Sequence, residues 1–195
     1  MTVKTRSKLD DELEQILVGS INDRPSDEDS MEDRAPLRTK EVVIVAESGD
    51  LERTWATLIL ATSAAASGMQ VSLFFTFWGL FPLVRPDQRV TGTNWMQRGL
   101  SLLNRPGIGH LKLGRMNFLG MGPWMMKRLA RQQGVALPDE LLEIAQAMGV
   151  RLIPCQMSLD MLGIRRDQLI DGVEEPVGAA VALALMASAD ATLFI

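Results

Sequence analysis

The sequence predicts a single α/β domain, built as a three-layer sandwich around a mostly parallel sheet. Runs of consecutive apolar residues, such as VVIVA at 42–46 and VSLFFTF at 71–77, are typical of strands buried on both faces. Segments of helical period alternate with these runs, as in a sheet that is covered by helices on both sides. The 195 residues, of which 47% are apolar, have the size of one domain with a real core.

The first strand–helix–strand unit lies in the first half of the domain. The strand at 42–46 is followed by LERTWATLILATSAAASG at 51–68, which has a helical period and ends at Gly68. The second strand, at 71–77, completes a unit of about 35 residues, the length of a βαβ crossover. We expect a short apolar helix after this strand. The uncharged stretch 71–84 is shorter than the roughly 20 residues of a bilayer-spanning helix, so membrane-surface contact is the less favoured interpretation.

The middle of the chain, residues 85–122, shows little periodicity and is rich in glycine and basic residues. Such a stretch inside a compact domain is usually functional or mobile. Short helices fit at 94–103 and 122–133.

The last part of the chain returns to alternating elements. A helix is predicted at 137–149, because Pro138 suits its first position and Gly149 ends it. Pro176 begins a helix of small residues that we expect to pack closely against the sheet. The complete set of later elements is a helix at 137–149, a strand at 150–155, a helical turn at 156–164, a short helix and turn within 165–173, a helix at 176–190 and a strand at 191–195.

The N-terminal residues 1–38 form an acidic extension, with six basic and ten acidic residues, that we predict to be disordered. Residues 9–18 could form a short amphipathic helix, either a docking element or a solvated one. The α/β domain then covers 39–195. The early basic residues precede the acidic DDELEQ rather than an apolar segment, which argues against a secretory signal. We therefore expect a cytoplasmic protein without a transmembrane segment.

The composition excludes several kinds of site. The chain has one cysteine, one histidine and no tyrosine, so it can form no intramolecular disulfide. Cys155 and His110 are too few for a zinc site made of cysteines and histidines. We expect neither a metal nor a cofactor, and the obvious chemistry is that of one thiol.

The basic residues concentrate in one segment. Residues 85–131 contain nine basic residues and a single acidic one, although the chain as a whole has a net charge of −4 and a pI of about 5.1. The low pI argues against nucleic acid. A solvated face is the simplest interpretation; the alternative is an anionic partner protein or small anion. The candidate contacts for that alternative are Arg98, Lys112, Arg115 and Lys127.

Cys155 stands at the carboxyl end of a predicted strand and before a helical segment. Ligands gather at such strand ends in open α/β sheets, and amides at a helix N-terminus favour a thiolate. A buried, inert cysteine is an equally good interpretation of this spacing.

Other polar residues are placed where they could support a site. Glu47, Ser48, Gly49 and Asp50 follow the first strand, where amides could hold an anion, although Asp50 is better explained as a plain helix N-cap. Gln156 and Asp160 follow Cys155; Asp160 could face the thiol or cap the next turn. No dinucleotide or P-loop motif is present. Eight of the twelve methionines lie between 96 and 161, which suits packing and, less well, Cu(I) binding with Cys155.

The most specific motif is CQMSLDMLGI at 155–164. It is accompanied by EVVIVAESGDLERTWATLILATSAAASG, VSLFFTFWGL, MNFLGMGPWMM and the DGV turn at 171–173. Over about residues 40–195 these stretches resemble the DsrE/DsrF/DsrH-like family, in particular its larger DsrE-related subgroup, often labelled peroxiredoxin family proteins. The resemblance implies an α/β fold related in topology to flavodoxin and Rossmann folds, and usually an oligomer.

The resemblance also implies a function: a sulfane sulfur held as a persulfide on Cys155, received from and passed to TusA-like or rhodanese-like carriers. The chain lacks the second cysteine that some relatives carry, which undercuts a two-cysteine peroxidase and leaves a single-site relay. Whether such a relay is a sulfurtransferase enzyme stays open. The alternatives are a non-catalytic oligomeric binding or scaffold module with a buried cysteine, and a Cu(I)-binding module that uses Cys155 and methionines.

Overall fold

A computed structural model of the chain describes residues 39–88, 107–114 and 121–195. Its centre is a four-stranded parallel sheet with the order β3-β2-β1-β4. The strands are β1 (Glu41–Ala46), β2 (Gln70–Phe75), β3 (Arg151–Pro154) and β4 (Ala191–Phe194). The predicted α/β class and the predominantly parallel sheet are therefore confirmed.

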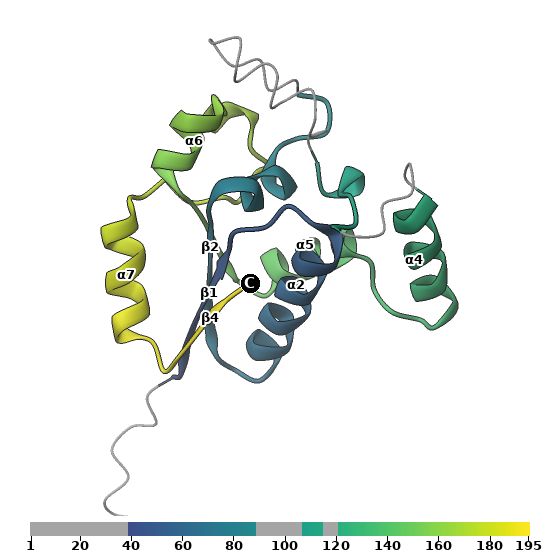
Figure 1. The fold of residues 1–195 in the computed structure, drawn as a ribbon. Coiled ribbons are helices and arrows are strands. Elements are labelled where there is room, and N and C mark those ends of the chain that lie inside the picture. The colour runs from purple at the N-terminus through teal and green to yellow at the C-terminus, as the bar shows by residue number, and fades with distance from the viewer. Residues whose placement is uncertain (1–38, 89–106, 115–120) are drawn as a thin grey trace, which may run out of the picture. The chain divides into compact units, whose positions relative to one another are not determined.

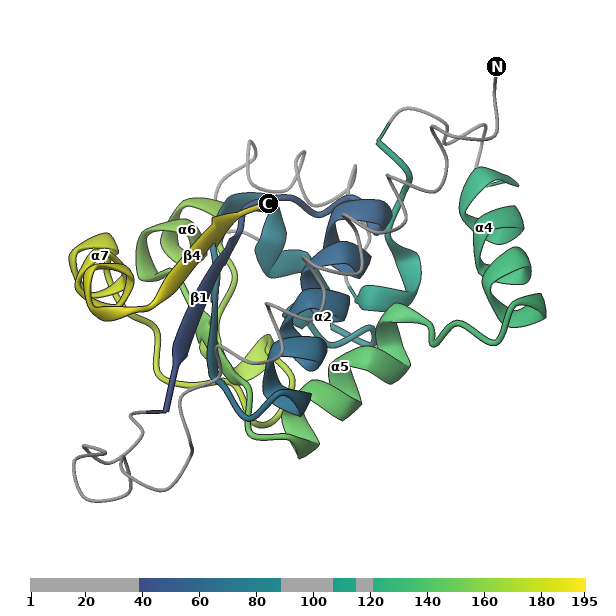
Figure 2. The ribbon, with the colours of Figure 1, turned by 90° about the horizontal axis from the view of Figure 1, so that it is seen from below.

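Helices lie on both sides of this sheet (Figures 1 and 2). One side carries α2 (Leu51–Ala66) and α5 (Pro138–Ala147), and α4 (Met121–Gln132) lies farther out on that side. The other side carries α6 (Gln156–Leu162) and α7 (Ala179–Ser188). The three layers match the predicted sandwich.

Alternation of side chains along the strands divides the core in two. Ile44 and Leu73 point to the α2 side, where they join the large buried cluster that also holds α2 and α5 residues. Val45 and Phe74, their neighbours in sequence, point to the α7 side and join a small cluster. Phe74 pairs with Ile153 in the register of β2 and β3. We call these the α2 face and the α7 face of the sheet.

The connections between the strands determine the topological switch point of the sheet. The chain runs from β1 through α2 to β2, and through α5 to β3, so both connections cover the α2 face. It then returns through α6 and α7 on the opposite face to β4, which pairs with the free side of β1. The carboxyl ends of β1 and β4 therefore form the topological switch point, the usual place of ligand sites in open α/β sheets.

The helix boundaries follow the predicted signals closely in the first part of the domain. Gly68 and Gly149 adopt positive φ angles of 78° and 77° just after α2 and α5, as expected of helix-ending glycines. The apolar stretch after β2 forms the 3-10 helix η1 (Phe77–Leu83), and residues 79–83 of it are buried. The predicted short apolar helix is therefore confirmed and packs inside the protein. The helix expected at 122–133 corresponds to α4.

Within 165–173, the expected short helix is the 3-10 helix η4 (Arg166–Gln168), and a turn follows at 171–172. Two other expectations for the last part of the chain are corrected. The helix expected at 176–190 is shorter, since α7 begins three residues after Pro176, and only its Ala182 is buried. All four residues of β4 are exposed, because this edge strand pairs with β1 alone. An apolar sequence run was therefore an inadequate sign of burial in α7 and β4.

The acidic extension 1–38, its helix at 9–18 and the helix at 94–103 lie outside the described residues, as do Arg98 and Arg115. Within the described parts, no helix combines the length and the apolar character needed to cross a membrane.

Candidate functional site

Cys155 is the first residue after β3 and the N-cap residue of α6. Its backbone N–H donates to the carbonyl of Phe75 at 2.8 Å, and its carbonyl accepts from the N–H of Leu159 at 3.0 Å. On the other side it forms an isolated parallel bridge with Val177, whose carbonyl accepts from the N–H of Gln156. The backbone at Cys155 is thus held between β2 and the 173–177 segment, at the strand end that the sequence predicts.

The thiol of Cys155 is free, and the residue is only 2% exposed. It packs on the α7 face with Phe74, Ile153 and Ala182. Leu185 and Met186 of α7 pack partly buried against the same cluster. Since Ala182 also belongs to α7, this helix is the cover of Cys155.

The predicted supporting residues of α6 pair with each other. The side-chain amide of Gln156 donates to Asp160 Oδ1 at 2.8 Å, one helical turn away. Both side chains are exposed, whereas Cys155 is buried. They therefore lie on the solvent side of α6.

Ser158 is a polar residue that our sequence analysis does not single out, although it belongs to the CQMS motif. It is completely buried, its hydroxyl lies 3.0 Å from Thr76 Oγ1, and it accepts from the N–H of Phe77 at 3.0 Å. Phe77 is the one non-glycine with positive φ (46°) among the described residues. A serine on the same helical face as Leu159 and Leu162 was the available signal of a buried hydrogen bond. Ser158 thus anchors the first turn of α6 to the strained end of β2.

The residues after β1 form a tightly connected loop. The backbone N–H of Glu47 donates to the carbonyl of Ile195, and the carboxylate of Glu47 pairs with Arg53 at 3.4 Å. Ser48 Oγ accepts from the N–H of Asp50 at 3.1 Å. Asp50 occupies the N-cap position of α2, as the N-cap interpretation predicts. Its side chain, however, makes no capping hydrogen bond.

Lys112 comes together with this loop. The N–H of Leu51 donates to the carbonyl of Lys112 at 2.8 Å, and Asp50 and Lys112 form a parallel bridge. A cavity of about 370 Å³ opens here. Its lining includes predicted site residues and the only histidine, but not Cys155; the residues are Ser48, Gly49, Asp50, Trp78, Phe81, His110, Leu111, Lys112, Leu113 and Gly114. Apart from Lys127, the described sequence-predicted residues therefore fall in two places: around Cys155, and in this cavity or the loop beside it.

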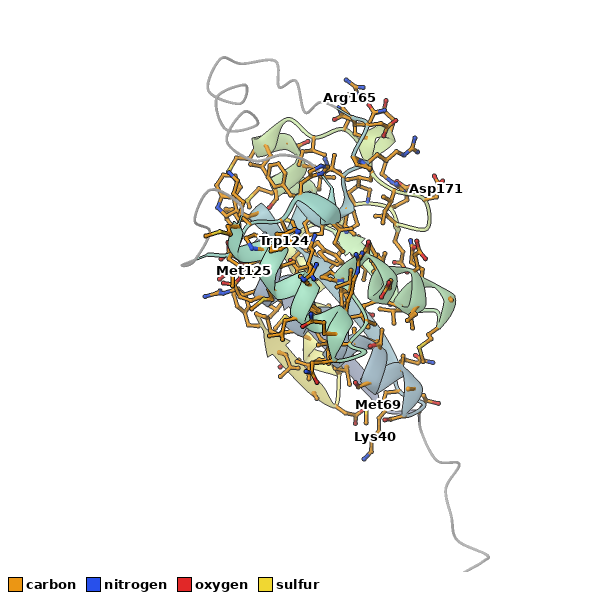
Figure 3. All side chains as sticks on the ribbon, turned by 90° about the vertical axis from the view of Figure 1, so that its right-hand side faces the viewer. Lys40, Met69, Trp124, Met125, Arg165 and Asp171 are labelled. Atoms are coloured by element: carbon orange, nitrogen blue, oxygen red, sulfur yellow. The ribbon has the colours of Figure 1, made fainter. Side chains whose placement is uncertain are left out.

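Lys127 belongs to α4, where its ammonium group donates to the carbonyl of Gly109 at 2.9 Å. The exposed side of α4 is apolar and basic. Trp124 and Met125 are more than half exposed on it (Figure 3), and the guanidinium of Arg128 lies 5.6 Å from the Trp124 ring centroid. The helix Met121–Gln132 contains no acidic residue.

A second uncovered apolar surface lies on α7 and β4. Leu183 and Phe194 are 65% and 66% exposed and Val181 is exposed as well, whereas the exposed Leu193 pairs with Ile44 and therefore points to the α2 face. The two elements carry no charged side chain. We call this the α7–β4 surface. As for metals, the described residues contain no group of three or more His, Cys, Asp or Glu side chains that could hold an ion.

Comparisons with known proteins fit this architecture. Residues 38–194 match the DsrE/DsrF/DrsH-like family. The chain is 35% identical over 162 residues to the sulfur carrier protein DsrE2 of Allochromatium vinosum, covering 82% of this chain and all of the relative. It is 34% identical over 158 residues to the uncharacterized protein YrkE of Bacillus subtilis, covering 81% of this chain and 98% of that protein.

A similar fold occurs in the crystal structure of the ychN protein from E. coli. The TM-score is 0.51 at 20% sequence identity, over 80% of this chain and all of that one. The family match spans all but the last residue of the described domain, and both relatives are covered almost completely. The chain therefore belongs to the DsrE/DsrF/DrsH-like family.

Proposed function

We propose that this protein is a sulfur carrier that holds a sulfane sulfur as a persulfide on Cys155 and passes it to a partner thiol. The observation that carries the proposal is the position of its single thiol, at the carboxyl end of β3 in the CQMS motif. The family and the relative named as a sulfur carrier support the same conclusion.

The proposed transfer needs no external oxidant. The Cys155 thiolate attacks the sulfane sulfur of a donor persulfide, so that a new S–S bond forms while the donor's S–S bond breaks and the donor leaves as a thiolate. An acceptor thiolate then attacks the outer sulfur of the Cys155 persulfide, and Cys155 leaves as a thiolate. With one cysteine the chain cannot resolve the persulfide into an internal disulfide.

Transfer requires that Cys155 be reached by a partner, and α7 is the element that must move. Cys155 is 2% exposed, and Ala182 is the only buried residue of the helix that covers it. A helix attached through so few buried side chains opens at a lower free-energy cost than the whole domain unfolds. We infer that local displacement of α7 admits the donor and the acceptor.

The proposed partners are acidic carriers of the TusA-like or rhodanese-like kind, and the proposed location is the cytoplasm. Lys127, Arg128 and Arg131 share α4 with several exposed apolar residues, so this helix would attract an acidic protein and offer it an apolar contact. A hollow of about 710 Å³ beside Trp124 is the concave surface at which that apolar contact would form.

The experiment is sulfur uptake followed by intact-protein mass spectrometry. After incubation with inorganic polysulfide, the parent protein should gain the mass of one sulfur atom, removable with dithiothreitol. Cys155→Ser should gain none, whereas Met157→Leu, a change in an exposed side chain two residues away, should behave like the parent. Uptake by Cys155→Ser equal to that of the parent would refute the proposal.

A second candidate function is favoured by two observations, the burial of Cys155 and the exposed α7–β4 surface. On this alternative the protein is a non-catalytic oligomeric scaffold that associates through α7 and β4. A charge-free apolar surface is suited to a second copy of the chain, and we propose such a homo-oligomer for the sulfur carrier as well. Light scattering of Leu183→Glu should show dissociation. Only the scaffold alternative predicts no sulfur uptake by the intact parent.

A further inference from the structure

Helix α7 connects the cover of Cys155 to the exposed α7–β4 surface. Its Ala182 is buried in the cluster around Cys155. Val181 and Leu183, the neighbours of Ala182 in sequence, are exposed. Ala182 is the one buried residue of α7, and the helix carries no charged side chain. A helix as apolar as this one is normally covered, and a cover for its outer side is missing from the described part of the chain.

The edge strand β4 adds a second open feature. Among the described strands it pairs with β1 alone, so its outer edge presents backbone N–H and C=O groups for a further strand (Figure 2). Its residues Ala191–Phe194 include neither a charge nor a proline, two of the devices that protect an exposed edge. Phe194 pairs with Val45, which belongs to the cluster around Cys155, so the exposed Phe194 side chain points to the α7 face.

One symmetric arrangement satisfies both features. Antiparallel pairing of β4 with β4 of a second copy, about a two-fold axis perpendicular to the sheet, joins two four-stranded sheets edge to edge. This axis leaves the α7 faces of both copies on the same side, so the Phe194 side chains and the α7 helices gather on one side of the joined sheet. The surface has no charge by which to select a partner of different chemistry, so a second copy is its favoured occupant.

Pairing of this kind holds the cover of Cys155 in place. For a thiol to reach Cys155, α7 must move, and in the pair the same helix is also held by the second copy. A contact that forms only with the closed helix lowers the population of the open one. We propose that two copies associate through β4 and α7, and that this association keeps Cys155 covered, so that its thiol reacts in the unpaired chain. This regulation rests on the homo-oligomer and the movement of α7 in the proposed function, but its test does not depend on sulfur transfer.

The first test measures alkylation of Cys155 by a fixed excess of iodoacetamide in the full chain, over a range of protein concentrations. Light scattering reports the paired fraction at each concentration. If only unpaired chains react, the rate per chain should be about tenfold lower where about nine-tenths of the chains are paired than in dilute solution. An equal rate at all concentrations, or scattering of single chains throughout, would overturn the proposal. Absence of sulfur uptake with this concentration dependence intact would refute the sulfur carrier alone.

Two variants separate loss of pairing from a loosened helix. Phe194→Glu places a charge on β4 and leaves α7 unchanged, and Leu183→Glu places one on the exposed side of α7. Both should dissociate the pair and raise the alkylation rate about tenfold at the high protein concentration. In dilute solution Phe194→Glu should react like the parent, because the parent is then unpaired as well.

The matched control is Leu129→Glu, a change of the same kind on α4 at a side chain of similar exposure. This variant should keep the concentration dependence of the parent. A Phe194→Glu protein that reacts as slowly as Leu129→Glu at the high concentration would also overturn the proposal.

Discussion

The two faces of the sheet are built very differently. On the α2 face, β1, β2 and β3 contribute alternate residues to a continuous cluster that includes residues of α2, α5 and η1, together with Leu159 and Leu162 of α6. On the α7 face, the buried cluster among the described residues contains only Val45, Phe74, Ile153, Cys155 and Ala182. Hydrophobic stabilisation grows with the apolar area removed from water, so the α2 face holds most of the stability of the domain.

The only thiol lies in the thin layer. Cys155 is as well buried as the core residues of the α2 face, but the helix over it has a single buried residue. The same low exposed fraction therefore indicates different things on the two faces of the sheet. On the α2 face it means permanent burial, and on the α7 face it means a cover that opens locally at modest cost.

The largest expected effect compares two glycines. A Cβ on Gly79, in η1 on the α2 face, would lie 2.1 Å from the carbonyl oxygen of Ala46, whereas a Cβ on Gly178, just before α7, meets nothing within 4 Å. Gly79→Ala must displace backbone, and we expect it to lower the free energy of unfolding by about 4 kcal/mol or to prevent folding. Gly178→Ala should change it by less than about 0.5 kcal/mol. Urea unfolding followed by circular dichroism measures both, and similar losses would contradict the comparison.

The next prediction uses two fully buried residues of similar volume. Leu73 points to the α2 face and Ile153 to the α7 face, and both are at most 1% exposed. We expect Leu73→Ala to cost about 4 kcal/mol and Ile153→Ala about 2–3 kcal/mol, because the thin layer can close over a cavity more easily. Equal costs in urea unfolding would show that the α7 face is as rigid as the other.

Labelling of Cys155 with a thiol reagent distinguishes local from global opening. If α7 opens locally, Ile153→Ala should accelerate native-state labelling about tenfold relative to Leu73→Ala, even though it destabilises the domain less. If the thiol were exposed only by complete unfolding, labelling rates would instead follow the global free energies of unfolding, with Leu73→Ala the faster. Rates are measured in excess reagent and referred to the urea-unfolded chain.

Much of the α2 face could be predicted from sequence, because its signals are local. The runs at 42–46 and 71–77, the helical period of 51–68 and the stop at Gly68 depend on neighbouring residues, and each was found. The α7 face could not be predicted in this way. The apolar composition of 176–190 indicates burial, but burial depends on what covers the helix, and α7 and β4 form the edge of the sheet.

The candidate site shows the same limit. The strand end at Cys155 is a local property, but its cover by Ala182 depends on how the chain returns across the sheet. Ser158 bonds to Thr76, 82 residues away, and the cavity joins Asp50 to Lys112. No spacing rule connects residues so far apart in sequence. The family resemblance identified Cys155 and its motif but left the cavity without a role.

Ser158 links the end of β2 to the helix after Cys155, and its loss should have an intermediate effect. Ser158→Ala removes the hydroxyl that accepts from Phe77 N–H and pairs with Thr76 Oγ1, leaving buried polar groups without that partner. We expect a loss of about 1–3 kcal/mol in urea unfolding. The exposed Ser188→Ala, whose hydroxyl bonds only within its own helix turn, should cost less than about 0.5 kcal/mol. A cost for Ser158→Ala no larger than this control would deny it an anchoring role.

The smallest expected effect lies outside both faces, at the exposed pair of Arg165 and Asp167 (Arg165 is labelled in Figure 3). The hydrogen bond from Arg165 holds the pKa of the Asp167 carboxyl below its ordinary value. A carboxyl with a lowered pKa in the folded state stabilises the fold above the pKa of the unfolded chain, and this contribution disappears as the pH falls through the folded pKa. Both side chains are exposed, so salt should weaken the effect. Carboxyl NMR titration should show the Asp167 midpoint rising in Arg165→Gln and rising less in Arg85→Gln, since Arg85 acts on Asp167 only through the weakest of the contributing charges. An unchanged midpoint in Arg165→Gln would mean that the pair does not persist in solution.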